Sequence, residues 1–367
     1  MHRSLFPTTA IVLALLAGSA PALADITIGV AGPMTGPKAA FGEQFRHGAD
    51  KVIADINAKG GVLGQKLVAI YGDDSCEPKQ AVAVANEMVA KKVPFVAGHF
   101  CSGSSIPASD VYAESGILQI SPGTTSPVYT ERGLPYAFRT CGRDDQQGRT
   151  TAEYIARALK GKTVAIIHDR SAYGKGLADR TRDELHRVGI TEVLYEAISV
   201  GDKDFSALVT RLKSEKVDLL FLGGYYTEGG LIARQMRDQG LKTVLMGGDA
   251  LVSEEFWAIT GPAGEGTMMT FSPDPRKNPD NTELVKYYRD HNYEPEAYTL
   301  YTYGSIQAWA QAVEKAGTTD TKKVAAVLKA NSFDTVLGRI GFDSKGDIVA
   351  PSYVMYVWKN GKAEYAE

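Results

Sequence analysis

The chain has 367 residues, of which 23% are charged and 44% hydrophobic, and its formal net charge is −3. Basic residues are scattered and no Cys/His finger occurs, so the sequence gives no sign of nucleic-acid binding or of a metal site. A chain of this length exceeds what one hydrophobic core usually supports, and we therefore expect two lobes.

The N-terminus has the pattern of an export signal. His2 and Arg3 form a short positive end, residues 11–17 are apolar, and Ala22-Leu23-Ala24 is a small-x-small cleavage motif. The apolar run is too short to span a bilayer, so we predict a cleaved signal peptide over residues 1–24 rather than the alternative, a membrane anchor. No later segment has 18 consecutive apolar residues, and we expect no direct membrane insertion.

Three cysteines, Cys76, Cys101 and Cys141, are present. Export places them in an oxidising compartment where one pair should bond, and the sequence alone allows three pairings. Cys76 and Cys101 each follow a predicted strand, and neighbouring strand ends would bring them close. Such a bridge would close a loop of about 25 residues, worth on the order of 3 kcal/mol in the chain-entropy description.

Strands and helices alternate along most of the chain. In its first part we expect strands at 26–30, 67–71, 93–97 and 117–120, and helices at 45–56, 80–91 and 104–114. The alternation restarts with helices at 150–159, 176–187, 205–215 and 230–239, and strands at 163–167, 192–198, 218–222 and 244–246. A loop at 274–281 precedes helices at 282–292, 300–316 and 321–331 and strands at 338–342 and 353–358. Repeated βα units predict an α/β protein with two doubly wound, Rossmann-like lobes.

Ligands of open α/β sheets bind beyond the carboxyl ends of the strands. Two such segments of the first lobe, residues 98–105 (GHFCSGSS) and 121–127 (SPGTTSP), are rich in hydroxyl groups and stand where helices should start. Helix starts offer free N–H groups and a positive dipole end, which suit a carboxylate. Ordinary helix capping by Ser and Thr is the alternative interpretation.

The second lobe offers aromatic and acidic residues at equivalent places. Tyr173, Tyr225 and Asp249 each lie shortly after a predicted strand. Tyrosine rings can cover apolar ligand surface, and a carboxylate can pair with an ammonium group. Solvated turn residues are the alternative for each of them.

Enzyme signatures are weak. The sequence has no G-x-S-x-G and no H-E-x-x-H. Residues 161–163 (GKT) resemble half a P-loop, but Ala156 stands where the first glycine is required. The pair His168-Asp169 has no nucleophile that can be assigned to it. We therefore expect no enzyme activity and no cofactor.

Several strings resemble the leucine/isoleucine/valine-binding proteins of ABC importers, from about Asp25 to the C-terminus. They are NAKGG at 57–61, DD at 73–74, PKQAVAVAN at 78–86, GHFCS at 98–102 and GDKDFS at 201–206. The resemblance implies a type I periplasmic binding protein, in which two lobes close around a ligand like a Venus flytrap. It also implies that residues 25–143 plus 273–352 form the N-terminal lobe and residues 144–272 plus 353–367 the C-terminal lobe.

The resemblance further implies a ligand site. The family's carboxylate-binding serine corresponds to Ser102, and its small-small-Thr loop corresponds to residues 123–125. The ammonium-pairing acid is usually Glu but is Asp249 in this chain, which is one methylene shorter. A family Tyr corresponds to Phe41, which lacks the hydroxyl, and a pocket Phe corresponds to Tyr298, which adds one. The full predicted ligand site is Phe41, Phe100, Ser102, Gly123, Thr124, Thr125, Asp144, Tyr173, Tyr225, Asp249 and Tyr298, and the family disulfide corresponds to Cys76–Cys101.

These inferences lead to one expected function. We predict a monomeric periplasmic protein that binds a branched-chain or other small α-amino acid and delivers it to the membrane permease of an ABC importer. One alternative is an extracytoplasmic sensor for a related carboxylate such as γ-aminobutyrate or an aromatic acid. An exported hydrolase is a further alternative, which substrate turnover would reveal.

Overall fold

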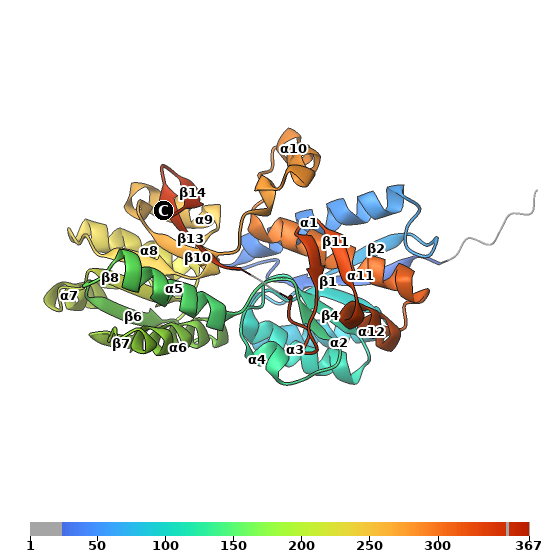
Figure 1. The fold of residues 1–367 in the computed structure, drawn as a ribbon, viewed down its shortest axis with the longest axis horizontal. Helices are drawn as coiled ribbons and strands as arrows, with labels where there is room; N and C mark the ends of the chain where they lie inside the picture. The colour runs from blue at the N-terminus through green and yellow to red at the C-terminus, as the bar shows by residue number, and fades with distance from the viewer. Residues whose placement is uncertain (1–23, 350–351, 367) are drawn as a thin grey trace, which may run out of the picture.

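The computed structural model describes residues 24–349 and 352–366. All but the last residue of the predicted signal peptide therefore lie outside the described residues. Two α/β lobes stand side by side (Figure 1). In the part of the chain that is described, no helix is both long and apolar enough to cross a membrane.

The first lobe is built on a five-stranded parallel sheet in the order β2-β1-β3-β4-β5. Its strands are β1 (Ile26–Gly32), β2 (Leu67–Asp73), β3 (Phe95–Gly98), β4 (Leu118–Ser121) and β5 (Ala137–Arg139). Its helices are α1 (Ala39–Ala58), α2 (Pro78–Ala90), α3 (Ser102–Glu114), α4 (Val128–Glu131), α11 (Ala297–Ala316) and α12 (Thr321–Ala330), with a hairpin of β11 (Ser332–Thr335) and β12 (Gly338–Gly341).

The second lobe is built on a seven-stranded sheet in the order β14-β13-β10-β9-β8-β6-β7. Its strands are β6 (Val164–His168), β7 (Leu194–Ala197), β8 (Leu219–Gly223), β9 (Val244–Gly247), β10 (Met268–Phe271), β13 (Val354–Lys359) and β14 (Lys362–Tyr365), of which β13 and β14 pair antiparallel. Its helices are α5 (Asp144–Ala158), α6 (Ala172–Arg187), α7 (Ser206–Ser214), α8 (Tyr226–Asp238) and α9 (Glu254–Thr260). Helix α10 (Thr282–Asp290) lies in the chain between β10 of this sheet and α11 of the first lobe.

Helix α1 illustrates how the sequence pattern produces the fold. Its apolar residues Phe41, Phe45, Ala49 and Val52 recur at helical spacing and are all buried. This face packs on β1 and on α11, a helix from the far end of the chain. Figure 1 shows the blue α1 beside the orange α11.

The chain passes between the two sheets three times: after β5, after β10 and before β13. These passages place β13 and β14, drawn in red, in the second lobe (Figure 1). The fold class predicted from the sequence is confirmed, whereas the boundaries assigned to the two lobes stay a prediction.

The structure corrects several predicted elements. The short strands β5, β10, β11 and β14 were not expected from the sequence. Helices α5, α6 and α8 begin earlier than their apolar periodicity indicates, because their first turns are polar or contain glycine. The segment after β4 leads only to the four-residue helix α4, so the expected helix start exists at Ser102 but not at residues 123–125.

The route by which Cys76 and Cys101 meet also differs from the expectation. They form the predicted disulfide, with Cα atoms 5.5 Å apart. However, β2 and β3 are not neighbours, because β1 lies between them. The loop after β2 reaches across the end of β1 to the start of α3. Cys141 is free and buried, and burial raises the pKa of its thiol.

Candidate ligand-binding site

The predicted site residues gather where the two lobes meet. Ten of them, all except Gly123, have side chains no more than 3% exposed, and Gly123 is buried as well. First-lobe members come from α1, the start of α3, the loop after β4 and the start of α11. Second-lobe members come from the starts of α5 and α6 and from the segments after β8 and β9. Because these residues are buried, a ligand can reach them only if the lobes separate.

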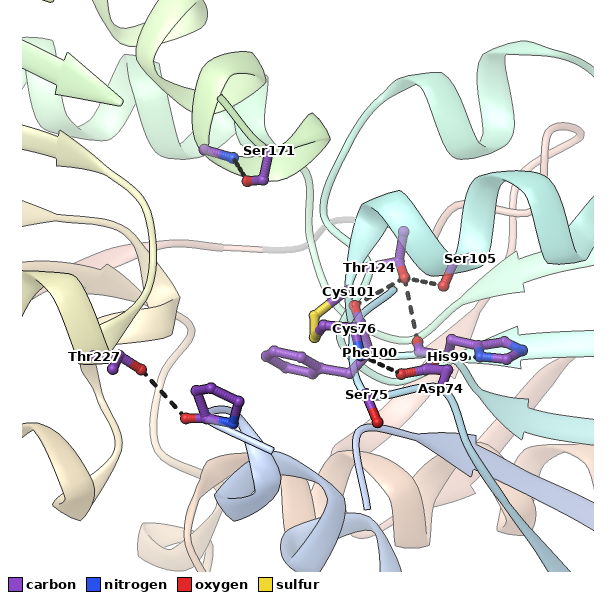
Figure 2. The surroundings of a disulfide bond; sticks show 12 residues. Asp74, Ser75, Cys76, His99, Phe100, Cys101, Ser105, Thr124, Ser171 and Thr227 are labelled. Atoms are coloured by element: carbon purple, nitrogen blue, oxygen red, sulfur yellow. Dashed lines mark hydrogen bonds and ion pairs between the residues drawn. A yellow bond between two sulfur atoms is a disulfide. The ribbon is translucent and has the colours of Figure 1, made fainter. Parts of the chain in front are cut away.

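The first-lobe wall is organised by a buried hydrogen-bond network beneath the disulfide (Figure 2). Asp74 accepts a hydrogen bond from the N–H of Cys76 (2.8 Å), and its other carboxylate oxygen lies 2.5 Å from Nδ1 of His99. The hydroxyl of Thr124 contacts that of Ser105 and donates toward the carbonyls of His99 and Phe100. The network therefore fixes the segment that contains Ser102.

The loop at residues 123–125 is held from behind by a buried cation. Arg139 is 0% exposed and donates to the carbonyls of Thr124 (2.7 Å) and Ser126 (3.0 Å). Its Nε lies 2.7 Å from a carboxylate oxygen of Asp347. This charge is therefore neutralised inside the lobe, and it orients the loop without serving as a ligand-binding group itself.

Thr124 and Thr125 differ in what their hydroxyls can do. The hydroxyl of Thr124 is occupied by the interior network, whereas that of Thr125 is buried and makes no hydrogen bond of regular geometry among the described residues, although it lies close enough to the Asp144 carboxyl to lower its pKa. Buried polar groups in native proteins nearly always find a partner. Thr125 is thus the member of the pair with a hydroxyl available to a ligand. Ser102 accepts a hydrogen bond from Ser126 N–H (3.3 Å) and keeps its own proton to donate.

Asp249 is the centre of the second-lobe wall. Its Oδ1 accepts hydrogen bonds from Gln147 Nε2 (2.9 Å) and the Tyr173 hydroxyl (2.8 Å). Its Oδ2 accepts one from the hydroxyl of Tyr298, which belongs to the first lobe. A carboxylate has about four acceptor positions, so one position on Oδ2 remains for a further donor. Tyr298 differs from the family pattern by its hydroxyl, and this hydroxyl forms a hydrogen bond to the opposite lobe.

A second buried acid stands beside Asp249. The N–H of Asp144 donates to the carbonyl of Thr125 (3.0 Å), and its side chain is 0% exposed. Burial and, second, the nearby charge of Asp249 together raise the pKa of Asp144 to about 8. Burial also raises the pKa of Asp249, although its three hydrogen bonds oppose this.

Gln147 joins these two acids and was not predicted as a site residue. Its Nε2 donates to Asp144 (3.1 Å) and to Asp249, while its Oε1 accepts from the N–H of Asp249 (3.1 Å) and the hydroxyl of Thr270 (2.6 Å). The amide is therefore locked with its donor side toward the carboxylates. Its position three residues after Asp144 on one helix was the available sequence signal.

Aromatic rings fill the space next to these polar groups. Phe41 and Phe100 are stacked with centroids 3.9 Å apart, and the ring of Tyr298 meets both edge-on at 5.7 and 4.9 Å. Tyr225 lies 5.1 Å from Tyr173 and 6.5 Å from Phe100. A Cβ at position 123 would come within 2.4 Å of Phe100, so glycine is required there.

The chain is similar to known binding proteins over nearly its whole length. Residues 25–363 match the family described as periplasmic binding protein. A Leu/Ile/Val-binding protein homolog 1 of Brucella suis is 51% identical over 362 residues, covering 98% of this chain and 97% of that protein. An amino acid binding protein of Pseudomonas aeruginosa is 48% identical over 371 residues, covering 100% and 99% of the two chains.

A solved structure gives the same picture at lower identity. The branched-chain amino acid transporter substrate binding protein LivJ of Streptococcus pneumoniae, in complex with isoleucine, superposes with a TM-score of 0.86 at 28% identity, covering 94% of this chain and 99% of that one. Membership of a family of binding proteins confirms the expectation that the chain is not an enzyme. The chain belongs to the periplasmic binding protein family.

Proposed function

We propose that this protein binds an α-amino acid between its lobes in the periplasm and delivers it to the permease of an ABC importer. The observation that carries the proposal is the pairing of two walls. One bears uncharged donors at Ser102 and Thr125, and the other bears the buried carboxylate of Asp249 with one free acceptor position. A zwitterion with a carboxylate at one end and an ammonium group at the other complements both walls. The amino-acid ligands in the names of the relatives support the same reading.

Closure is part of the proposed mechanism. The Tyr298 hydroxyl donates a hydrogen bond to Asp249 in the other lobe, and the carbonyl of Thr125 accepts one from the first N–H of α5. The proposed site is therefore complete only when the two lobes meet. A ligand that contacts both walls stabilises that arrangement relative to the separated one. The permease would then recognise the closed arrangement.

Isothermal titration calorimetry with matched ligands tests the proposal. We expect at least one α-amino acid to bind, and its amide and its decarboxylated amine each to bind at least tenfold more weakly. Mass spectrometry of the small molecule released on denaturing the exported protein would identify the natural ligand. If the amide binds as tightly as the acid, the first-lobe wall is not an anion site and the proposal is wrong.

A further inference from the structure

A second contact between the lobes lies beside the site and uses a different set of residues. Pro37 and Lys38, at the start of α1, dock on the first turn of α8 in the second lobe. The carbonyl of Pro37 accepts hydrogen bonds from the hydroxyls of Tyr226 (2.9 Å) and Thr227 (3.2 Å). Figure 2 shows Thr227 opposite the disulfide, with its bond to the first lobe dashed.

Lys38 extends this contact into the second lobe. Its side chain is only 7% exposed, although lysine is rarely buried without a partner. The Nζ atom stands over the ring of Tyr225, 4.6 Å from the centroid. An ammonium group at this distance is attracted by the face of the ring.

Two buried acids of the second lobe lie on either side of Tyr225: a Cβ at Gly224 would be 3.5 Å from Asp169 Oδ2, and Glu228 is in the first turn of α8, which follows Tyr225 directly. Asp169 and Glu228 are each 2% exposed, and each has one carboxylate oxygen without a hydrogen-bond partner among the described residues. Their other oxygens accept hydrogen bonds from the N–H groups of Ser171 (2.9 Å) and Gly201 (2.9 Å). Burial raises the pKa of Asp169, the hydrogen bonds from Ser171 and the charge of Lys38 lower it, and the charge of Glu228 raises it, so Asp169 interacts electrostatically with both Lys38 and Glu228.

We propose that Lys38, Asp169 and Glu228 form a cross-lobe clasp that favours the closed arrangement. This proposal rests on the proposed function, because the clasp would set how readily the two lobes close around a ligand. The clasp residues would not contact the ligand themselves. Without Lys38, closure buries two like charges that have unpaired oxygens and no neighbouring cation, which is strongly unfavourable. When the lobes separate, water solvates the acids, so the penalty falls on the closed form alone.

A disulfide trap measures closure without any ligand. A Cβ at Gly103 on α3 would lie 4.0 Å from the Cβ of Ala172 on α6 in the opposite lobe, a separation suited to a disulfide. Gly103→Cys with Ala172→Cys therefore reports the closed population through its rate of oxidation. Cys141 is buried with a raised thiol pKa and does not compete.

In this trap background, Lys38→Met is expected to slow oxidation about 5- to 50-fold, and Lys38→Arg to restore most of the rate. With Asp169→Asn and Glu228→Gln present, Lys38→Met should change the rate less than about 3-fold, because the acids that need the cation are gone. Equal rates with and without Lys38 would overturn the clasp.

Ligand binding separates the clasp from a direct role in recognition. With L-leucine as the probe, Lys38→Met should weaken binding by the same factor by which it slows the trap. If binding weakens while the trap rate stays unchanged, Lys38 contacts the ligand and the clasp is wrong. If L-leucine does not bind, the trap still tests the clasp, and only the proposed function is called into question.

Discussion

On the first lobe, the groups proposed to face the ligand are uncharged: the Ser102 and Thr125 hydroxyls belong to a wall behind which the buried cation Arg139 is turned inward onto carbonyls and Asp347. On the second lobe, two carboxylates, Asp144 and Asp249, are buried together and linked by an amide. Burying neutral donors costs little free energy of desolvation, so such a wall can bind an anion cheaply. Burying two carboxyl groups costs much more, and in the closed arrangement this cost is present with or without a ligand. The acidic wall should therefore respond more strongly to substitution and to pH.

The largest expected effect is on the acidic wall. Asp249→Asn should weaken binding of the α-amino acid by roughly 2–4 kcal/mol, because the ligand ammonium would be buried without its charge partner. Calorimetry at pH 7.5 measures it, and Asp238→Asn, an exposed aspartate on α8, is the matched control. An unchanged dissociation constant for Asp249→Asn would remove this residue from the site.

Substitutions in the uncharged wall should weaken ligand binding less, and they should affect Thr125 and its neighbour Thr124 differently. Thr125→Ala and Ser102→Ala should each weaken binding by about 1.5–3 kcal/mol, since each removes one hydroxyl from a charged group. The melting temperature of the ligand-free protein should stay nearly the same for Thr125→Ala, whose hydroxyl makes no regular hydrogen bond within the part of the chain that is described.

Thr124→Ala is the matched comparison for Thr125→Ala. Its hydroxyl bonds to Ser105 and to two carbonyls inside the lobe, so its loss should lower stability by about 1–3 kcal/mol. Equal stability losses for the two variants would show that the difference between the two hydroxyls does not hold in solution.

The sequence was informative wherever a local pattern sufficed. Apolar periodicity predicted α1, and strand-to-loop transitions together with the family resemblance placed the eleven candidate residues at the interface of the lobes. Helix α8 shows the limit. The predicted helix begins at Gly230, but α8 begins at Tyr226, because the paired glycines Gly229 and Gly230 mask the start; glycine is present at 230 since a Cβ there would come within 2.6 Å of Ile259.

Contacts between residues far apart in sequence were not predictable from one chain. Strand β5 is three residues long and contains Arg139, a residue unusual in a buried strand, which Asp347 neutralises from more than 200 positions away. The linking role of Gln147 and the burial of Lys38 likewise depend on the packing of the two lobes. These buried polar contacts form only when distant segments pack together, so a single sequence does not reveal them.

The last expected effect is a pH dependence of stability that comes from Asp144 in the acidic wall, and it is smaller than the preceding effects only within a single pH unit. Asp144 has its pKa raised to about 8, against about 4 for an unfolded chain. A raised pKa means that the folded form holds the proton more tightly, so this stabilisation is fully present below about pH 4 and is lost as the pH rises through about 8.

Between pH 5 and 8 the ligand-free protein should lose up to about 1.4 kcal/mol of unfolding free energy per pH unit relative to Asp144→Asn, which cannot ionise. Urea denaturation at fixed ionic strength measures both proteins, and the same comparison in an Asp249→Asn background separates the effect of Asp144 from its interaction with Asp249. Parallel stability curves would mean that water reaches Asp144 in the ligand-free protein. The acidic wall would then be formed only when the lobes close on a ligand, and the contrast between the two walls would be a property of the closed form.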